Sequence, residues 1–263
     1  MELFFLGTSA ALVSKNRHNT SLLVKKEADL LLIDCNGACL QMLMKQGIDY
    51  ENLSHIFFTH EHIDHMCAIT NLVHQIWMKT CYAKSAKQEK RTKPLNIYGN
   101  SAVIKLVEKL LNLVDLPQHP DIFPIHFHDL GLEPTKAKIG SFDVEIFPVE
   151  HGHCNCSGVK IHNPKGKALV YSADTEICDA VTSRTDKQDV LVHECSELED
   201  AHLSGHTTLS EIEANIERLN ANELYIVHVP DVTEDAHARV KALAQTSGKK
   251  ITIPDDGDSV LLR

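Results

Sequence analysis

The chain has 263 residues, of which 43% are hydrophobic and 24% are charged, so it can bury a substantial core. Its formal net charge is -10, from 26 Lys and Arg against 36 Asp and Glu. An acidic surface repels phosphate backbones and disfavours extensive wrapping of nucleic acid, although a basic segment or a bound cation can reverse the sign at one site.

The eight cysteines indicate a reducing compartment. None of them forms a C-x-x-C pair and several lie in apolar runs, which is typical of buried, reduced thiols rather than of a disulfide framework. The apolar residues 1–7 lack a basic leader and end at Gly7, so we expect a first strand and a turn there rather than a signal peptide. No apolar run approaches the length of a membrane span. We therefore expect a cytoplasmic protein without membrane contact.

Taken in order, the chain alternates short apolar strands with amphipathic helices. Helical spacing of apolar residues predicts helices over 38–45, from 66 to 77, over 102–114, from 208 and over 234–245. The helix from 208 opens with the capping box Thr208-Leu209-Ser210-Glu211, and the helix over 234–245 closes at Gly248. Strands are expected at 2–6, 21–25, 30–33, 56–58, 95–98, 124–127, 142–149, 159–161, 168–171, 190–192 and 224–227, with two more at the end. Without a linker or repeat, this predicts one α/β domain over residues 1–263.

The densest group of metal-binding side chains follows the strand at 56–58. Five such residues lie within six positions: His60, Glu61, His62, Asp64 and His65. Because side chains alternate at the end of a strand, His60 and His62 can point the same way. Asp64 and His65 then lie at the start of the next helix. The sequence therefore predicts a metal site on this turn.

An ionisable residue also appears at the exit of each of four later strands: His151, Asp174, His193 with Glu194, and His228. Strand ends that converge on one edge of a sheet are where α/β proteins place their sites. Imidazole and carboxylate together suit zinc, manganese or iron. These residues are therefore predicted to complete the metal site.

Thr59-His60-x-His62-x-Asp64-His65 resembles the signature of the metallo-β-lactamase superfamily. Four later segments are similar to its ribonuclease Z branch: 171–175, 193–195, 205–208 and 227–230. The likeness covers nearly the whole chain in the right order. It implies a metallo-β-lactamase-like four-layer αββα sandwich.

The resemblance also implies two divalent metal ions, zinc or else manganese or iron. It assigns His60, His62 and His151 to one ion, Asp64, His65 and His228 to the other, and Asp174 to the bridge between them. A bridging carboxylate and hydroxide are reasonable there, because two close cations need an anion between them.

Other interpretations remain open for several residues. His153 competes with His151, which we favour because it directly follows a strand. His206 is either a solvated loop histidine or a functional group. Glu194 orients a ligand or caps a strand. Asp34 braces a ligand or caps the helix at 38–45, and capping is the simpler interpretation.

The predicted reaction is two-metal hydrolysis of a phosphodiester. Asp64 would orient the attacking water or take its proton, and His206 would donate to a phosphate oxygen or protonate the leaving alkoxide. A thioester or lactone hydrolase on the same fold is an alternative.

The substrate is expected to be small. Ribonucleases Z that process tRNA carry a long exosite arm between the third metal histidine and the bridging aspartate, whereas His151 and Asp174 are only 23 positions apart. This favours a cyclic nucleotide or a short oligonucleotide over tRNA. The basic segment 79–93 keeps a tRNA 3'-processing endoribonuclease as an alternative and is where a polyanion would bind first. Relatives of this type are commonly homodimers, so a homodimer is expected.

Overall fold

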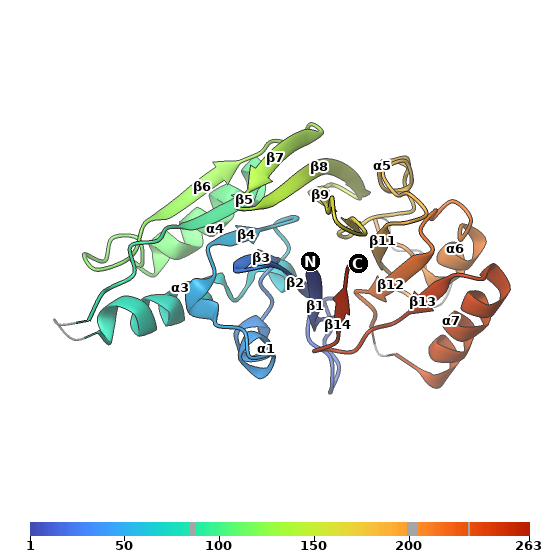
Figure 1. Ribbon diagram of the computed structural model, residues 1–263, viewed down its shortest axis with the longest axis horizontal. Helices are drawn as coiled ribbons and strands as arrows, with labels where there is room; N and C mark the ends of the chain where they lie inside the picture. Colours follow the sequence, from blue (N-terminus) through green and yellow to red (C-terminus); the bar gives the residue numbers. More distant parts are fainter. Residues whose placement is uncertain (85–87, 199–204, 231) are drawn as a thin grey trace.

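Two sheets lie face to face in the computed structural model, which describes residues 1–84, 88–198, 205–230 and 232–263 (Figure 1). Within these residues each sheet has seven strands. The first has the order β14 (Ser259–Leu261), β1 (Glu2–Gly7), β2 (Ser21–Lys26), β3 (Asp29–Ile33), β4 (His55–Phe57), β5 (Leu95–Gly99) and β6 (Ile125–Asp129). The second has the order β13 (Lys250–Thr252), β12 (Glu223–Val227), β11 (Val190–Glu194), β10 (Leu169–Tyr171), β9 (Cys154–His162), β8 (Phe142–His151) and β7 (Thr135–Ile139).

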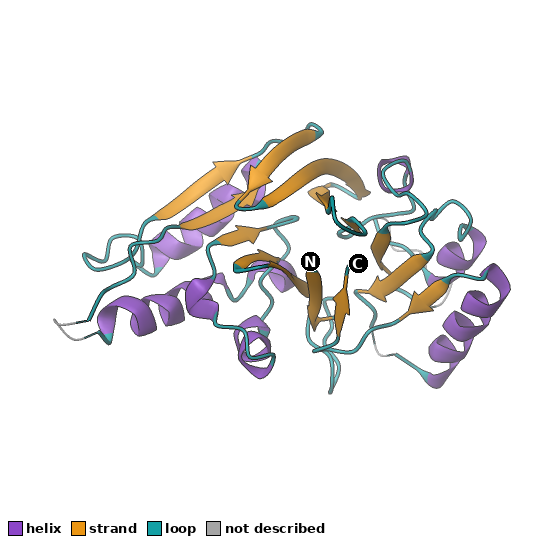
Figure 2. Cartoon of the chain, viewed as in Figure 1, coloured by secondary structure: helices purple, strands orange, loops and turns teal. Residues whose placement is uncertain are grey.

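The helices cover the outer faces of the two sheets (Figure 2). On the side of the first sheet are α1 (Cys39–Lys45), α2 (Ile63–Met66), α3 (Ile69–Trp77) and α4 (Ser101–Leu113), with a 3-10 turn at Tyr50–Asn52 and a π-helical turn at Met78–Tyr82. On the side of the second sheet are α5 (Asp179–Thr182), α6 (Leu209–Ala214) and α7 (Glu234–Ser247). Within the described part of the chain, none of these helices is long and apolar enough to cross a membrane.

The core consists of three apolar clusters, one between each pair of adjacent layers. Phe5 and Tyr171 belong to the cluster between the sheets. Phe4, the neighbour of Phe5, packs with Trp77 under the helices of the first sheet, and Ile212 packs in the cluster under those of the second. Since successive side chains of a strand point to opposite faces, a strand in an inner layer must be apolar on both. The predicted four-layer αββα sandwich is confirmed.

Two helix ends follow the predicted chemistry. Thr208 and Glu211 form the reciprocal capping box at the start of α6, with each side chain accepting a hydrogen bond from the other residue's backbone N–H. Gly248 ends α7 with a φ of 68°, a left-handed conformation that glycine adopts without steric cost.

The prediction of one helix from 66 to 77 was wrong. The chain forms α2 and α3 with a break at Cys67 and Ala68. The backbone N–H of Cys35 donates to the carbonyl of His65, and the N–H of Ala68 donates to the carbonyl of Cys35. The turn after β3 thus takes up backbone groups that a continuous helix would use, and it joins β3 to the predicted metal-binding segment.

Strand β7 was not expected. Its sequence, Thr-Lys-Ala-Lys-Ile, places lysines at alternate positions, and β7 forms one edge of the second sheet. Lysine-bearing edge strands resist pairing with other chains, but their few apolar residues give a weak sequence signal.

The ends of β4, β8, β10, β11 and β12 meet where the two sheets come together. The carbonyl of Thr59, just after β4, accepts from the N–H of Ser157 in β9, at 3.1 Å. The carbonyl of Val229, just after β12, accepts from the N–H of Ala10, at 3.3 Å. Segments distant in the chain are thereby tied together at one place.

Candidate metal centre

Among the residues with left-handed backbone conformations, three lie at strand exits around the predicted metal site. Asp34, Ala173 and His228 have φ values of 60°, 56° and 56°. Each such residue is strained by about 1–3 kcal/mol, and strain of this kind persists where the surrounding structure fixes it, often at functional sites. The three turns lie next to or within the predicted metal-binding segments.

One group contains His60, His62, His151 and Asp174. One ligand atom from each lies within 4.8 Å of all the others. Nε2 of His151 is 3.1 Å from Nδ1 of His62, and Nε2 of His60 is 3.7 Å from Oδ2 of Asp174. The competing residue His153 is not a member of this group and lies in the adjacent pocket.

A second group contains Asp64, His65 and His228. Oδ2 of Asp64 is 3.4 Å from Nε2 of His65 and from Nε2 of His228. Oδ2 of Asp174 lies 3.2 Å from each of the same two nitrogens. Asp174 therefore contacts both groups with one carboxylate, as a bridging ligand would.

Two buried atoms of these groups have no hydrogen-bond partner among the described residues: Nε2 of His60 and Oδ1 of Asp174. His60 and Asp174 are 0% and 1% exposed. Buried polar atoms without a partner are rare in native proteins, and an ion is one of the ordinary explanations. The nitrogen and carboxylate donors match the preferences of zinc, manganese and iron. The arrangement fits a metal centre.

The other ring nitrogens are held by neighbouring groups. Nδ1 of His151 donates to the carbonyl of Gly205 at 2.7 Å, and Nδ1 of His65 donates to Oδ2 of Asp34 at 2.8 Å. Nδ1 of His228 lies 2.7 Å from Oγ of Ser196. A hydrogen bond at Nδ1 leaves Nε2 free to bind a cation and fixes the orientation of the ring.

Burial and charge set the protonation of His60, His151 and Asp174. Burial, with His65 nearby, holds the pKa of His60 well below its usual value, and burial also lowers the pKa of His151. Burial alone would raise the pKa of Asp174, but His228 and His65 outweigh it and hold that pKa low. Neutral imidazole and ionised carboxylate are the forms that bind metal.

Asp34 does not cap α1, so the simpler interpretation was wrong. That helix begins after Ala38 without a side-chain cap. The Asp34 carboxylate instead accepts hydrogen bonds from the backbone N–H and the hydroxyl of Thr59 and from His65. It is fully buried, and burial raises its pKa. Asp34 braces the turn that carries the first group and orients one histidine of the second.

Glu194 lies at the end of β11 with its side chain 0% exposed. Oε1 accepts from the N–H of Thr175 at 3.0 Å and lies 2.8 Å from Nδ1 of His206. Oε2 accepts from the N–H and the hydroxyl of Ser196, both at 2.8 Å. Glu194 therefore orients His206 directly, and through Ser196 it supports His228.

His206 lies beside the centre rather than in a solvated loop. Its ring stacks on that of His228, with centroids 5.7 Å apart, and its side chain is 18% exposed. Burial lowers its pKa, but Glu194 outweighs this effect and raises it. The ring therefore holds a proton more firmly than an ordinary histidine and suits the role of a proton donor.

The sequence reasoning assigned no role to Ser196 or Thr59. Oγ of Ser196 contacts Glu194, His206 and His228, while Oγ1 of Thr59 lies 2.9 Å from Nδ1 of His60. Ser196 directly follows the segment 193–195 and Thr59 is the first residue of the signature at 59–65, and these positions were the available signal.

The basic segment 79–93 lies at one end of the molecule, beyond α3 (Figure 1). Lys79 pairs with Glu51, Lys90 pairs with Asp121, and Arg91 donates to the carbonyls of Glu51 and Leu53. Residues 85–87, including Lys87, lie outside the described residues. The described part of this segment does not line the pocket at the centre, and its hydrogen bonds indicate a structural role.

Comparison with known proteins adds independent findings. Residues 1–247 match a family model described as Anti-Pycsar protein Apyc1. The chain is 23% identical to ribonuclease Z of Thermococcus kodakarensis in an alignment 320 residues long, gaps included. This alignment covers 100% of this chain and 95% of that protein.

Two solved structures show the same fold. The metallo-β-lactamase fold protein YhfI from Bacillus subtilis is 22% identical with a TM-score of 0.79, covering 98% of each chain. Zn(2+)-bound PqqB from Methylobacterium extorquens is 14% identical with a TM-score of 0.75, covering 100% of each chain. The second of these proteins, as its description states, holds zinc on the same fold.

Proposed function

We propose, from the premise that this chain belongs to the Anti-Pycsar protein Apyc1 family within the ribonuclease Z-like branch of the metallo-β-lactamase superfamily, that it hydrolyses a small phosphodiester with two divalent metal ions. The chain is a metal-dependent hydrolase of the ribonuclease Z type. The observation that carries the proposal is the position of Asp174, whose Oδ2 lies 3.2 Å from both His65 and His228 and 3.7 Å from His60.

The two groups would each hold one ion. His60, His62 and His151 would bind the first, Asp64, His65 and His228 the second, and Asp174 both. We propose zinc, with manganese or iron as alternatives, because the donors are nitrogen and oxygen. When bound, two such ions supply a shared water with a pKa lowered to about 7 and offset the charge of the phosphoryl oxygens.

The protein's own residues would position the water and move the protons. Asp64 keeps a low pKa, because His228 and His65 outweigh the effect of burial, so its carboxylate can accept a hydrogen bond from the attacking water. His206, held by Glu194, would donate its proton to the leaving alkoxide. One group thus orients the nucleophile and the other neutralises the leaving group.

We propose that the substrate is a cyclic nucleotide or a short oligonucleotide. Residues 152–173, between His151 and Asp174, contain only β9, a turn and β10, so an extended arm does not fit there. The cavity beside the centre has a volume of about 480 Å³, which is within the range of small-molecule sites. Processing of tRNA, which is a much larger substrate, is not favoured.

We also propose a cytoplasmic location and a homodimer. All eight cysteines are free thiols, which agrees with a reducing compartment. Gel filtration with light scattering would test the assembly, and a mass of one chain would contradict it.

The test of the function is an assay after reconstitution with zinc or manganese. Bis(p-nitrophenyl) phosphate, a 3',5'-cyclic nucleotide, precursor tRNA, a thioester and a lactone would be compared at equal enzyme concentration. We expect hydrolysis of the two small diesters. Turnover of the acyl substrates alone, or of tRNA alone, would overturn the proposal.

A further inference from the structure

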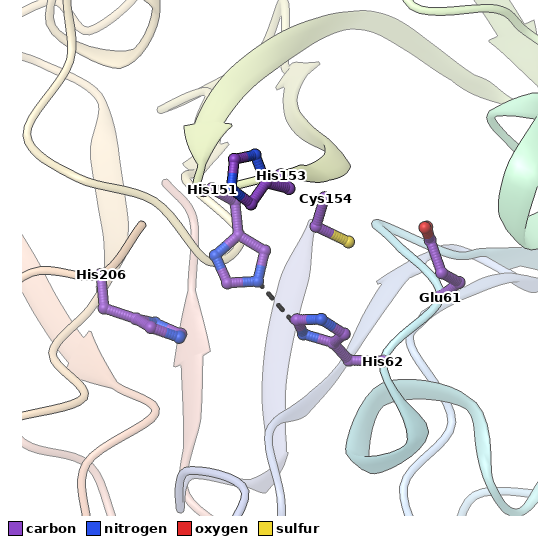
Figure 3. Close-up of a pocket in the computed structure, with 7 residues that line it drawn as sticks. Glu61, His62, His151, His153, Cys154 and His206 are labelled. Carbon is purple, nitrogen blue, oxygen red and sulfur yellow. Dashed lines mark hydrogen bonds between the residues drawn. The ribbon is translucent and has the colours of Figure 1, made fainter. Parts of the chain in front are cut away.

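The cavity beside the metal centre has two distinct sides. His62, His151 and His206 line it together with Gly152, His153 and Cys154, and with Glu61, which has no role so far. Figure 3 shows His206 and Glu61 on opposite sides, with the rings of His62 and His151 between them. A substrate held at the centre would therefore extend toward both.

Glu61 has an unsatisfied oxygen. Its Oε2 is buried and has no hydrogen-bond partner among the described residues. The thiol of Cys154 is hydrogen-bonded to the Glu61 side chain; burial, followed by Glu61, raises the pKa of that thiol to about 11, so it stays protonated at neutral pH. That contact still leaves Oε2 without a partner among the described residues. Buried acceptors without a donor are destabilising, and a ligand or water that supplies the donor is a common reason for their presence.

We infer that Glu61 determines substrate specificity by accepting a hydrogen bond from a hydroxyl or amino group on the nucleoside part of the substrate. The inference rests on the proposed phosphodiesterase function. An ionised carboxylate only accepts hydrogen bonds, so its partner must be a donor. It also repels the anionic phosphate, so it faces the uncharged part of the substrate.

The arrangement gives each side of the cavity one task. With the phosphate at the metal centre, the nucleoside would lie across the cavity, its leaving ribose oxygen on the side of His206 and its 2'-hydroxyl or base on the side of Glu61. Two donors of a nucleoside could reach a carboxylate: the ribose 2'-hydroxyl and an exocyclic amino group of the base. A site that hydrogen-bonds such a donor discriminates against analogues that lack it, because Oε2 of Glu61 is then left buried and without a donor.

The experiment compares three substrates on the metal-loaded enzyme: 3',5'-cyclic AMP, its 2'-deoxy analogue and the 3',5'-cyclic phosphate of purine riboside, which lacks the amino group. We expect kcat/KM to fall about ten- to a hundredfold for one of the two analogues. In Glu61→Gln the ratio of kcat/KM for cyclic AMP to kcat/KM for that analogue should shrink toward one, because an amide is a weaker acceptor than a carboxylate. Calorimetry should show the same pattern in the affinities for hydrolysis-resistant phosphorothioate versions of the three substrates: a weaker affinity for one analogue in the wild type, and a smaller difference in Glu61→Gln.

The control variant is Glu133→Gln, which removes the same charge from an exposed position outside the cavity and should keep the wild-type ratio. Equal kcat/KM for all three substrates in the wild type would overturn the inference, as would an unchanged ratio in Glu61→Gln. Bis(p-nitrophenyl) phosphate, which has neither sugar nor base, separates the two proposals. If the wild type hydrolyses it but does not discriminate, only this inference fails. If it hydrolyses no diester, the proposed function fails too.

Discussion

Nδ1 of His206 lies 2.8 Å from Oε1 of Glu194, a carboxylate that is completely buried. The contact joins a loop residue to the end of β11, and the same carboxylate also binds the backbone of Thr175 and Ser196. Because the negative charge of Glu194 favours the imidazolium form, this pair sets both the direction and the proton affinity of the His206 ring.

Replacing Glu194 with Gln should move the pH dependence of the reaction. Glu194 raises the pKa of His206, and a proton donor is active only below its pKa. Without that charge the pKa falls, so the alkaline limb of the kcat/KM profile should shift to lower pH. Rates on bis(p-nitrophenyl) phosphate between about pH 5 and 10 would measure it. A profile that drops uniformly without shifting would argue against the role of Glu194.

His206→Ala should reduce kcat by about 10²–10⁴-fold on a substrate with a poor leaving group, because the leaving alkoxide would depart without its proton. Metal content should stay at the wild-type level, since His206 is assigned proton transfer rather than metal binding. Elemental analysis and turnover of a cyclic nucleotide would be measured together. The exposed histidine variant His126→Ala is the control. Loss of metal, or unchanged turnover, would remove the proposed role.

Asp34→Asn should weaken metal binding although Asp34 is not a proposed ligand. Its carboxylate accepts the Nδ1 proton of His65 and holds Thr59, so its loss leaves both the ring and the turn less well oriented. Changes of this kind typically cost about 10–100-fold in metal affinity. Competition with a chromogenic zinc chelator would measure it, with the exposed Asp143→Asn as control. Equal zinc affinities of the wild type and Asp34→Asn would show that Asp34 is not needed to orient the centre.

Glu223→Gln should destabilise the fold at neutral pH. Although burial raises the pKa of Glu223, hydrogen bonds from Lys167, Lys250 and Tyr225 outweigh it and lower that pKa to about 2. A lowered carboxylate pKa stabilises the folded state above the unfolded-state value of about 4.5, and this contribution disappears as pH falls through about 2. We expect a loss of about 1–3 kcal/mol at pH 7.

Urea denaturation of wild type and Glu223→Gln at pH 7 and pH 3 would measure this contribution. The difference between the two proteins should be smaller at pH 3. A difference that does not change with pH would mean that the ionised carboxylate is not what stabilises the fold.

Local sequence patterns predicted most of the elements because they depend on near neighbours. The capping box at Thr208 and the left-handed end at Gly248 involve residues within one or two helical turns, and both formed as expected. The strand exits that carry His60, Asp174 and His228 were also readable, since each follows a short apolar run.

The sequence patterns by themselves thus determined an α/β domain and the ionisable residues at its strand exits, and the family resemblance implied the four-layer arrangement. Only the tertiary structure decided what surrounds them. Asp34 read locally as a helix cap, yet it binds Thr59 and His65. Ser196 had no signal of its own, yet it links Glu194 to His228. The helix expected over 66–77 is broken by hydrogen bonds to Cys35. Apart from the contact between Ser196 and Glu194, these contacts join residues 25 to 33 positions apart. No local propensity encodes which distant polar group will satisfy a buried one.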